Sequence, residues 1–103
     1  MTRREQLLYL LEAYCGGRYD TPDFSSHMTR IFYIERDDSL SPEENAILAP
    51  LAHTADYFSP SPKDHAMYAG FTTEKDVKTA AQTAYQTLLT RYGVESFEGI
   101  LLQ

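Results

Sequence analysis

The chain has 103 residues, of which 43% are hydrophobic, and it carries a formal net charge of −6 at pH 7. This length suits one core, so we expect a single domain over residues 1–103. The negative charge argues against direct nucleic-acid binding, and no apolar run reaches the roughly 20 residues that a membrane-spanning helix needs. The single cysteine allows no internal disulfide, so we expect a cytoplasmic protein.

Capping residues predict a first helix that ends near Cys15. Thr2 and Glu5 have the spacing of a capping box, and apolar residues follow at helical intervals. Gly16 and Gly17 then provide a left-handed stop.

The second helix is expected to begin at Thr21-Pro22-Asp23, with Thr21 as its cap and proline in its first turn. Residues 36–39 are charged or polar and predict a solvated connection. The buried stripe of this helix comprises Phe24, Met28 and Ile31.

A third helix should begin at Pro42, because Ser41 and Glu44 form another capping box. Pro50 lies inside it and predicts a bend without a break. Its apolar stripe consists of Leu48, Leu51, Ala55 and Phe58.

Residues 59–70 contain two prolines and several polar residues, and we expect an irregular loop. Thr73 opens a fourth helix that Gly93 ends. The apolar tail after Val94 either docks on the core or pairs with another chain. No window alternates as a strand would, so the expected fold is all-α: a compact four-helix bundle with a Pro-rich loop between the third and fourth helices.

Residues 35–76 carry the whole net charge, since they hold nine acids and three bases while the rest of the chain is neutral. An acidic face of this kind binds basic partners, including proteins that themselves bind nucleic acid. This clustering is the first indication of function.

Several short segments together resemble one family, the immunity proteins of colicin D-type toxins and of contact-dependent growth-inhibition systems. They are Thr21-Pro22-Asp23-Phe24, Leu40-Ser41-Pro42, Ala55-Asp56-Tyr57-Phe58-Ser59-Pro60, Tyr68 and the helix from Val77 to Leu89. The resemblance implies a small four-helix bundle that binds the catalytic domain of a transfer-RNA-cleaving toxin. Its carboxylates would lie where RNA phosphates sit, so no catalysis and no cofactor are needed.

The family places acids around the Phe-x-Pro step, and here Asp56 keeps the first of them. Ser59 and Ser61 stand where further acids would be expected, which indicates either a different toxin type or a charge supplied by neighbouring turns. The acids in those turns are Asp37, Asp38 and Asp64.

Helical geometry places Asp56 toward solvent and Phe58 inward. Tyr57 and Tyr68 are candidate anchors, because tyrosine is enriched at binding hot spots. The competing interpretation of the acids is an ordinary solvated surface, and for Glu43 and Glu44 it is helix capping alone.

The sequence holds no set of residues typical of an enzyme or a metal site. His53 and Asp56 share a helix face, but two ligands are too few for a metal. Cys15 is expected to pack as a small apolar residue. An acidic helical adaptor or antitoxin-like regulator of a different protein remains an alternative, and the oligomeric state stays open.

Overall fold

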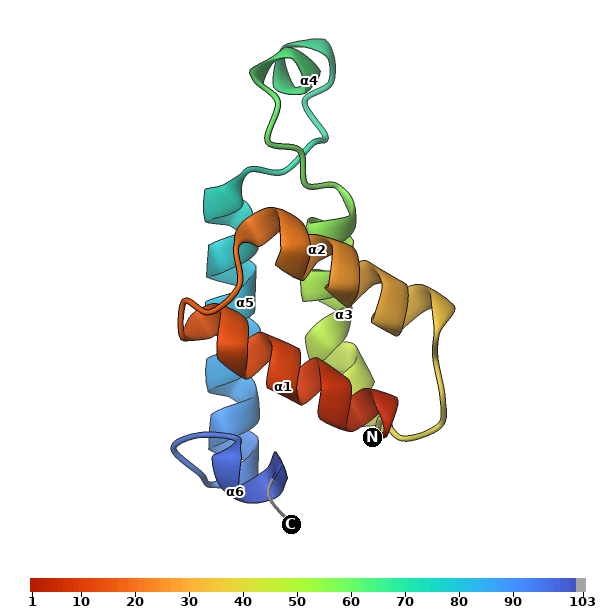
Figure 1. Ribbon diagram of the computed structural model, residues 1–103, viewed down its shortest axis with the longest axis vertical. Coiled ribbons are helices and arrows are strands. Elements are labelled where there is room, and N and C mark those ends of the chain that lie inside the picture. Colours follow the sequence, from red (N-terminus) through yellow and green to blue (C-terminus); the bar gives the residue numbers. More distant parts are fainter. Residues whose placement is uncertain (102–103) are drawn as a thin grey trace.

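The computed structural model describes residues 1–101, and these form helices without any β-strand (Figure 1). This confirms the all-α expectation. The one β-like feature among these residues is an isolated bridge between Phe58 and Thr72. The elements are α1 (Arg3–Cys15), α2 (Thr21–Thr29), the π-helical turn η1 (Arg30–Ile34), α3 (Pro42–Asp56), α4 (Pro62–Met67), α5 (Glu74–Tyr92) and α6 (Glu98–Leu101).

Local capping signals fix the starts of three helices as expected. Capping boxes open α1, α3 and α5, and their cap residues are Thr2, Ser41 and Thr73. The expected cap of α2 was wrong by one residue, because the Asp20 side chain accepts from Asp23 N while Thr21 is already helical. An aspartate carboxylate here satisfies a free N–H and also meets the positive helix end.

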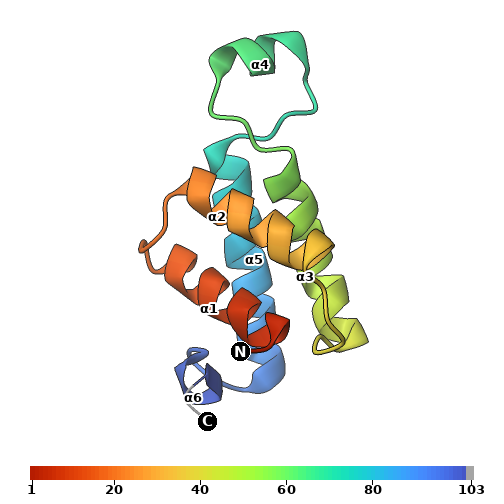
Figure 2. The same cartoon turned by 45° about the vertical axis from the view of Figure 1, so that its right-hand side comes forward.

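The long helices form two crossed layers. In Figure 1, α1 and α2 run in opposite directions across the antiparallel pair of α3 and α5, and the rotated view in Figure 2 shows the same order. We call these four helices with η1 the body. The core between the layers includes most of both expected stripes, with Phe24, Met28, Leu48 and Leu51 all nearly inaccessible. Phe58 is the exception, because it lies beyond the end of α3 and is only half-buried.

Helix α3 continues through Pro50 without interruption. Helix α5 ends as expected at Gly93, whose φ of 68° is a left-handed conformation that glycine adopts without steric cost. Gly17 is left-handed too, with φ 80°, so the glycines after α1 do provide the left-handed stop.

Two polar contacts join the layers inside the body. Glu44 of α3 is 5% exposed and accepts hydrogen bonds from the Arg4 guanidinium and the Tyr92 hydroxyl. Its role therefore extends beyond the capping that the sequence indicated. At the other end of α5, the buried hydroxyl of Thr21 donates to Glu74 at 2.9 Å.

The C-terminal tail folds back onto the body. Phe97 is fully buried against the rings of Tyr85 and Tyr92, while Ile100 and Leu101 pack on the edge of the core. The core-docking alternative therefore holds for these residues, and Leu102 and Gln103 lie outside the described range. None of the helices over residues 1–101 combines the length and apolarity needed to cross a membrane.

The loop expected over residues 59–70 is partly wrong, because it contains α4. Ser61 caps this helix and Pro62 takes its first position, which repeats the Ser-Pro start of α3. The prolines of this segment predict a loop, but a proline at the first position of a helix, as Pro62 is, favours a helix. The helix stands beyond the end of the body, and no residue in it is buried (Figure 1).

Candidate functional site

The segment from Phe58 to Thr72, which we call the α4 hairpin, projects from one end of the molecule (Figures 1 and 2). Its two ends meet at a neck. Thr72 N donates to Tyr57 O at 2.8 Å, Ser59 N donates to Thr72 O at 3.2 Å, and the Thr72 hydroxyl donates to Thr54 O at 2.6 Å. These bonds tie the hairpin to the last turn of α3, so the projection has a fixed base.

Three of the residues proposed from the sequence as partner contacts organise the hairpin from within. The Ser59 hydroxyl donates to Asp64 at 2.6 Å and accepts from Ser61 N at 3.2 Å, and Ser59 is only 7% exposed. Ser61 in turn caps α4, and His65 Nε2 bonds to Ser59 O at 2.7 Å. The serines that replace the expected acids thus hold the loop in shape.

The far side of the hairpin presents apolar side chains to solvent. Met67 is 77% exposed and Tyr68 is 53% exposed. The Tyr68 ring packs edge-on against Phe71, with 5.3 Å between centroids, and it covers the backbone of Gly70. A side chain at position 70 would collide with that ring, so glycine permits this arrangement.

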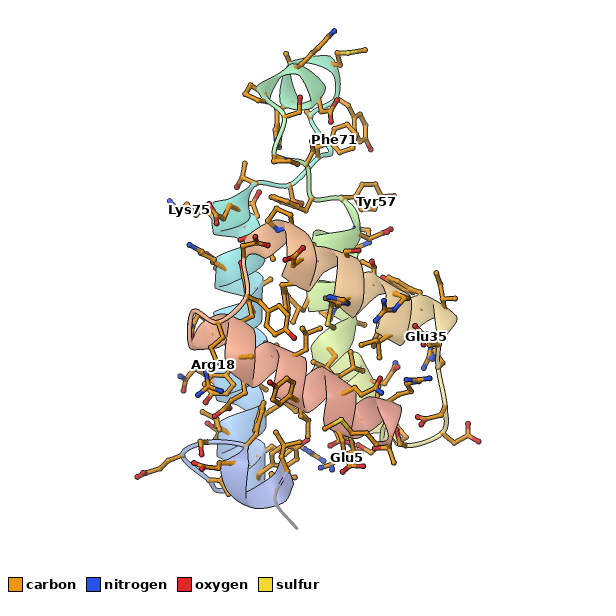
Figure 3. All side chains as sticks on the ribbon, viewed as in Figure 1. Glu5, Arg18, Glu35, Tyr57, Phe71 and Lys75 are labelled. Atoms are coloured by element: carbon orange, nitrogen blue, oxygen red, sulfur yellow. The ribbon has the colours of Figure 1, made fainter. Side chains whose placement is uncertain are left out.

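Asp56 and Tyr57 stand at the foot of the hairpin, and both are exposed, as the sequence predicted for Asp56. Figure 3 shows Tyr57 below Phe71 at the junction with the body. Tyr33 of η1 belongs to the same surroundings, since partial burial and then the charges of Asp56 and Tyr57 raise the pKa of Tyr33. An acid, two tyrosines and the hairpin therefore share one end of the molecule.

Asp37 and Asp38 do not join this group. They lie in the connection that leads into the first turn of α3, whereas Asp56 is its last residue, and 15 helical residues span about 22 Å. Asp37 accepts from the Ser39 hydroxyl and from Arg3 N, and these bonds lower its pKa. The single acidic edge expected from the sequence is therefore wrong, because α3 separates its two parts.

A groove runs beneath the hairpin. One hollow of about 480 Å³ reaches Glu74 and a second of about 270 Å³ reaches Asp56, and both are lined by Pro22, Phe58 and Pro60. Because the hollows share these three residues, we treat them as one feature, the α2 groove. It has a carboxylate at each end.

Cys15 and His53 are the remaining candidates for chemistry that the sequence offers. Within residues 1–101, no three His, Cys, Asp or Glu side chains gather as metal ligands would. Burial, with a smaller contribution from Glu12, raises the pKa of Cys15 to about 11, which keeps the thiol protonated at neutral pH. His53 lies against the Tyr57 ring, with 4.9 Å between centroids.

Sequence reasoning missed two exposed apolar residues at this end, Tyr33 and Met67. Tyr33 is 46% exposed and lies in η1, a π-helical turn of a kind that often occurs at functional sites. The sequence did not identify Met67, because the prolines and polar residues around it predict a loop. The serine and proline that start α4 were the available signal.

Comparison of the chain with protein-family models, with curated proteins and with solved structures finds no match.

Proposed function

We propose that this protein is an immunity protein, a stoichiometric inhibitor that binds the basic catalytic domain of a transfer-RNA-cleaving bacterial toxin and covers its active-site cleft. In this proposal the four long helices act as a four-helix bundle that presents the α4 hairpin. The resemblance of residues 55–60 and of the segments around them to colicin D-type immunity proteins supports the choice of target.

The observation that carries the proposal is the projecting hairpin, with exposed Met67 and Tyr68 above exposed Asp56 and Tyr57. A projection can enter a concave site that a flat helical surface cannot reach. Tyrosine and methionine supply apolar contact area, while a carboxylate at the rim pairs with lysine or arginine.

The negative charge of this protein favours an enzyme that acts on nucleic acids as its partner. An RNase cleft must be basic to hold phosphates, so a protein with a net charge of −6 is attracted to it. Rim charges of this type raise the association rate, and the rate falls as salt screens them. The inhibitor then needs no chemistry of its own.

The proposal is tested with the C-terminal domain of whatever protein is encoded immediately upstream of this chain. Cells that express the domain alone should lose intact transfer RNA and stop growing, and co-expression of this protein should restore both. Purified protein should inhibit completely at one equivalent and leave half of the activity at half an equivalent. Continued cleavage at an excess of this protein would contradict the proposal.

Two matched substitutions locate the interface. Asp56→Asn should slow association several-fold at low salt, whereas Asp38→Asn, an equal charge change at the other end of α3, should leave it unchanged. Tyr68→Ala should weaken binding by about 2 kcal/mol, which is roughly thirtyfold. An adaptor would give a different result, since the protein would bind its partner while the nuclease stayed active.

A further inference from the structure

The α2 groove combines apolar walls with acidic ends. Pro22 on α2, Pro60 on the hairpin and the half-buried Phe58 line both of its hollows. Prolines and an aromatic ring lose little conformational entropy on contact, so they suit the aliphatic stem of a long side chain.

The two carboxylates at the ends keep free acceptor capacity. Glu74 Oε1 accepts a hydrogen bond from the Thr21 hydroxyl at 2.9 Å, and Lys78 Nζ lies 3.6 Å from the same oxygen. Within residues 1–101, no donor bonds to Glu74 Oε2, and Asp56 has neither a hydrogen bond nor an ion pair through its side chain. Each carboxylate therefore has an oxygen available to an incoming cation.

The N-termini of α2 and α5 lie beside the groove, but they do not make it a binding site for an anion. Both α2 and α5 begin there, and the N-terminus of a helix is positive. However, the carboxylate of Asp20 caps α2 and that of Asp76 caps α5 by a hydrogen bond to Thr73 N. Protein carboxylates already neutralise these ends. Among the residues that line the groove, Glu74 and Asp56 are acidic and His65 is the one side chain that can become cationic, so the groove favours a cation.

Ser25 provides an independent indication of a ligand. It lies in the groove wall, it is 5% exposed, and its hydroxyl oxygen is buried without a hydrogen-bond partner. An unpaired buried hydroxyl costs free energy, because its hydrogen bonds to water are lost and not replaced. Rotation of the Ser25 side chain toward the groove would let a backbone amide or carbonyl of a bound segment give this hydroxyl its missing partner.

We infer that the α2 groove binds an extended basic loop of the partner, with cationic side chains paired to Glu74 and Asp56 and the backbone between them bonded to Ser25. The inference rests on the proposed function, because it assigns part of the same interface. The loop would pass beneath the hairpin while the hairpin enters the partner's cleft. The partner would thus be held from both sides of the neck.

A hexaarginine peptide with blocked ends is a suitable probe, and isotope-labelled protein is titrated with it by NMR. Saturable shifts should concentrate at the amides of Ser25, Asp56 and Glu74. The double variant Asp56→Asn, Glu74→Gln should weaken peptide binding at least tenfold. Both side chains are exposed and glutamine keeps the acceptor for Thr21, so the melting temperature should stay close to that of the wild type.

The matched control is Asp38→Asn with Glu95→Gln, which removes the same charge from exposed sites outside the groove. It should change peptide affinity by less than threefold. Equal weakening in both double variants, shifts spread over all acidic segments, or no shift at the groove would each overturn the inference.

The result is separable from the toxin assay. Peptide binding confined to the groove, together with failure to inhibit any nuclease, would keep the groove assignment and remove the proposed partner class. Inhibition of the toxin without peptide binding in the groove would keep the proposed function and remove the groove assignment.

Discussion

The Arg4 guanidinium donates from Nε to Glu44 Oε2 at 2.8 Å, which joins the first turns of α1 and α3 inside the body. The Tyr92 hydroxyl donates to the same oxygen, so the end of α5 is held there too. Glu44 also completes a capping box by accepting from Ser41 N at 2.9 Å. One carboxylate therefore links three of the four long helices.

Loss of this carboxylate should destabilise the whole domain. Removing one member of a buried ion pair leaves its partner uncompensated, and because the Arg4 side chain keeps 27% exposure we expect Glu44→Ala to cost about 2 kcal/mol. Urea denaturation measures this. Glu43→Ala is the control, since its one pairing, with Arg91 at 3.7 Å, is exposed and should contribute less than about 0.5 kcal/mol. Equal losses in the two variants would show that Glu44 acts only through helix capping.

The Glu44 contribution should depend on pH in a defined direction. Burial alone would raise the pKa of Glu44, but hydrogen bonds from Ser41, Tyr92 and Arg4 outweigh it and lower the pKa below 4.5. A lowered folded-state pKa stabilises the protein above the unfolded value, and this stabilisation is lost as the pH falls through the folded value. The difference in melting temperature between the wild type and Glu44→Gln should thus be constant from pH 6 to 8 and shrink below about pH 4.5. A difference that persists unchanged to pH 3 would contradict the assignment.

The sequence predicted those features whose causes are local. Capping boxes, the left-handed Gly93 and the apolar stripe of Phe24, Met28 and Ile31 each depend on residues a few positions apart, and all of them are present in the structure. Glu44 was interpreted as a cap for the same reason. Its other partners, Arg4 and Tyr92, are 40 and 48 positions away, and no local pattern identifies them.

The candidate site could be predicted only in part. Asp56 was placed correctly in solvent, because helical spacing fixes its direction relative to the buried stripe. The grouping of Asp56 with Asp37 was wrong. Both belong to the acidic stretch of the sequence, but the length of α3 separates them in space. The α2 groove joins segments from three parts of the chain, and no periodicity indicates such a feature.

The Ser59–Asp64 bond should control the order of the hairpin without controlling the stability of the body. Asp64→Ala removes the acceptor of the buried Ser59 hydroxyl, and α4 buries no residue that would compensate. Amides of α4 should then exchange with solvent at least tenfold faster, while those of α3 and α5 and the melting temperature change little. Hydrogen exchange read by mass spectrometry tests this. Lys63→Ala, an exposed change in the same helix, should leave the exchange of α4 unaffected.

Gly70→Ala should alter the surface of the hairpin while the fold stays intact. A Cβ at this position would lie 2.3 Å from the Tyr68 ring, so the exposed ring must rotate away and give up its contact with Phe71. Because the displaced group faces solvent, the free energy of unfolding should change by less than about 1 kcal/mol. The ring-current shift that Tyr68 imposes on the Gly70 α-protons in the wild type reports the arrangement, and Tyr68→Leu should abolish it.

The functional consequence of this change follows from the position of Tyr68. If the tyrosine anchors the interface, Gly70→Ala should weaken partner binding by about tenfold, which is less than the roughly thirtyfold loss expected when the ring itself is removed. Gly99→Ala is the matched control, because a Cβ there meets no atom within 4 Å. Full affinity in Gly70→Ala together with a displaced Tyr68 ring would show that the aromatic tip lies outside the interface.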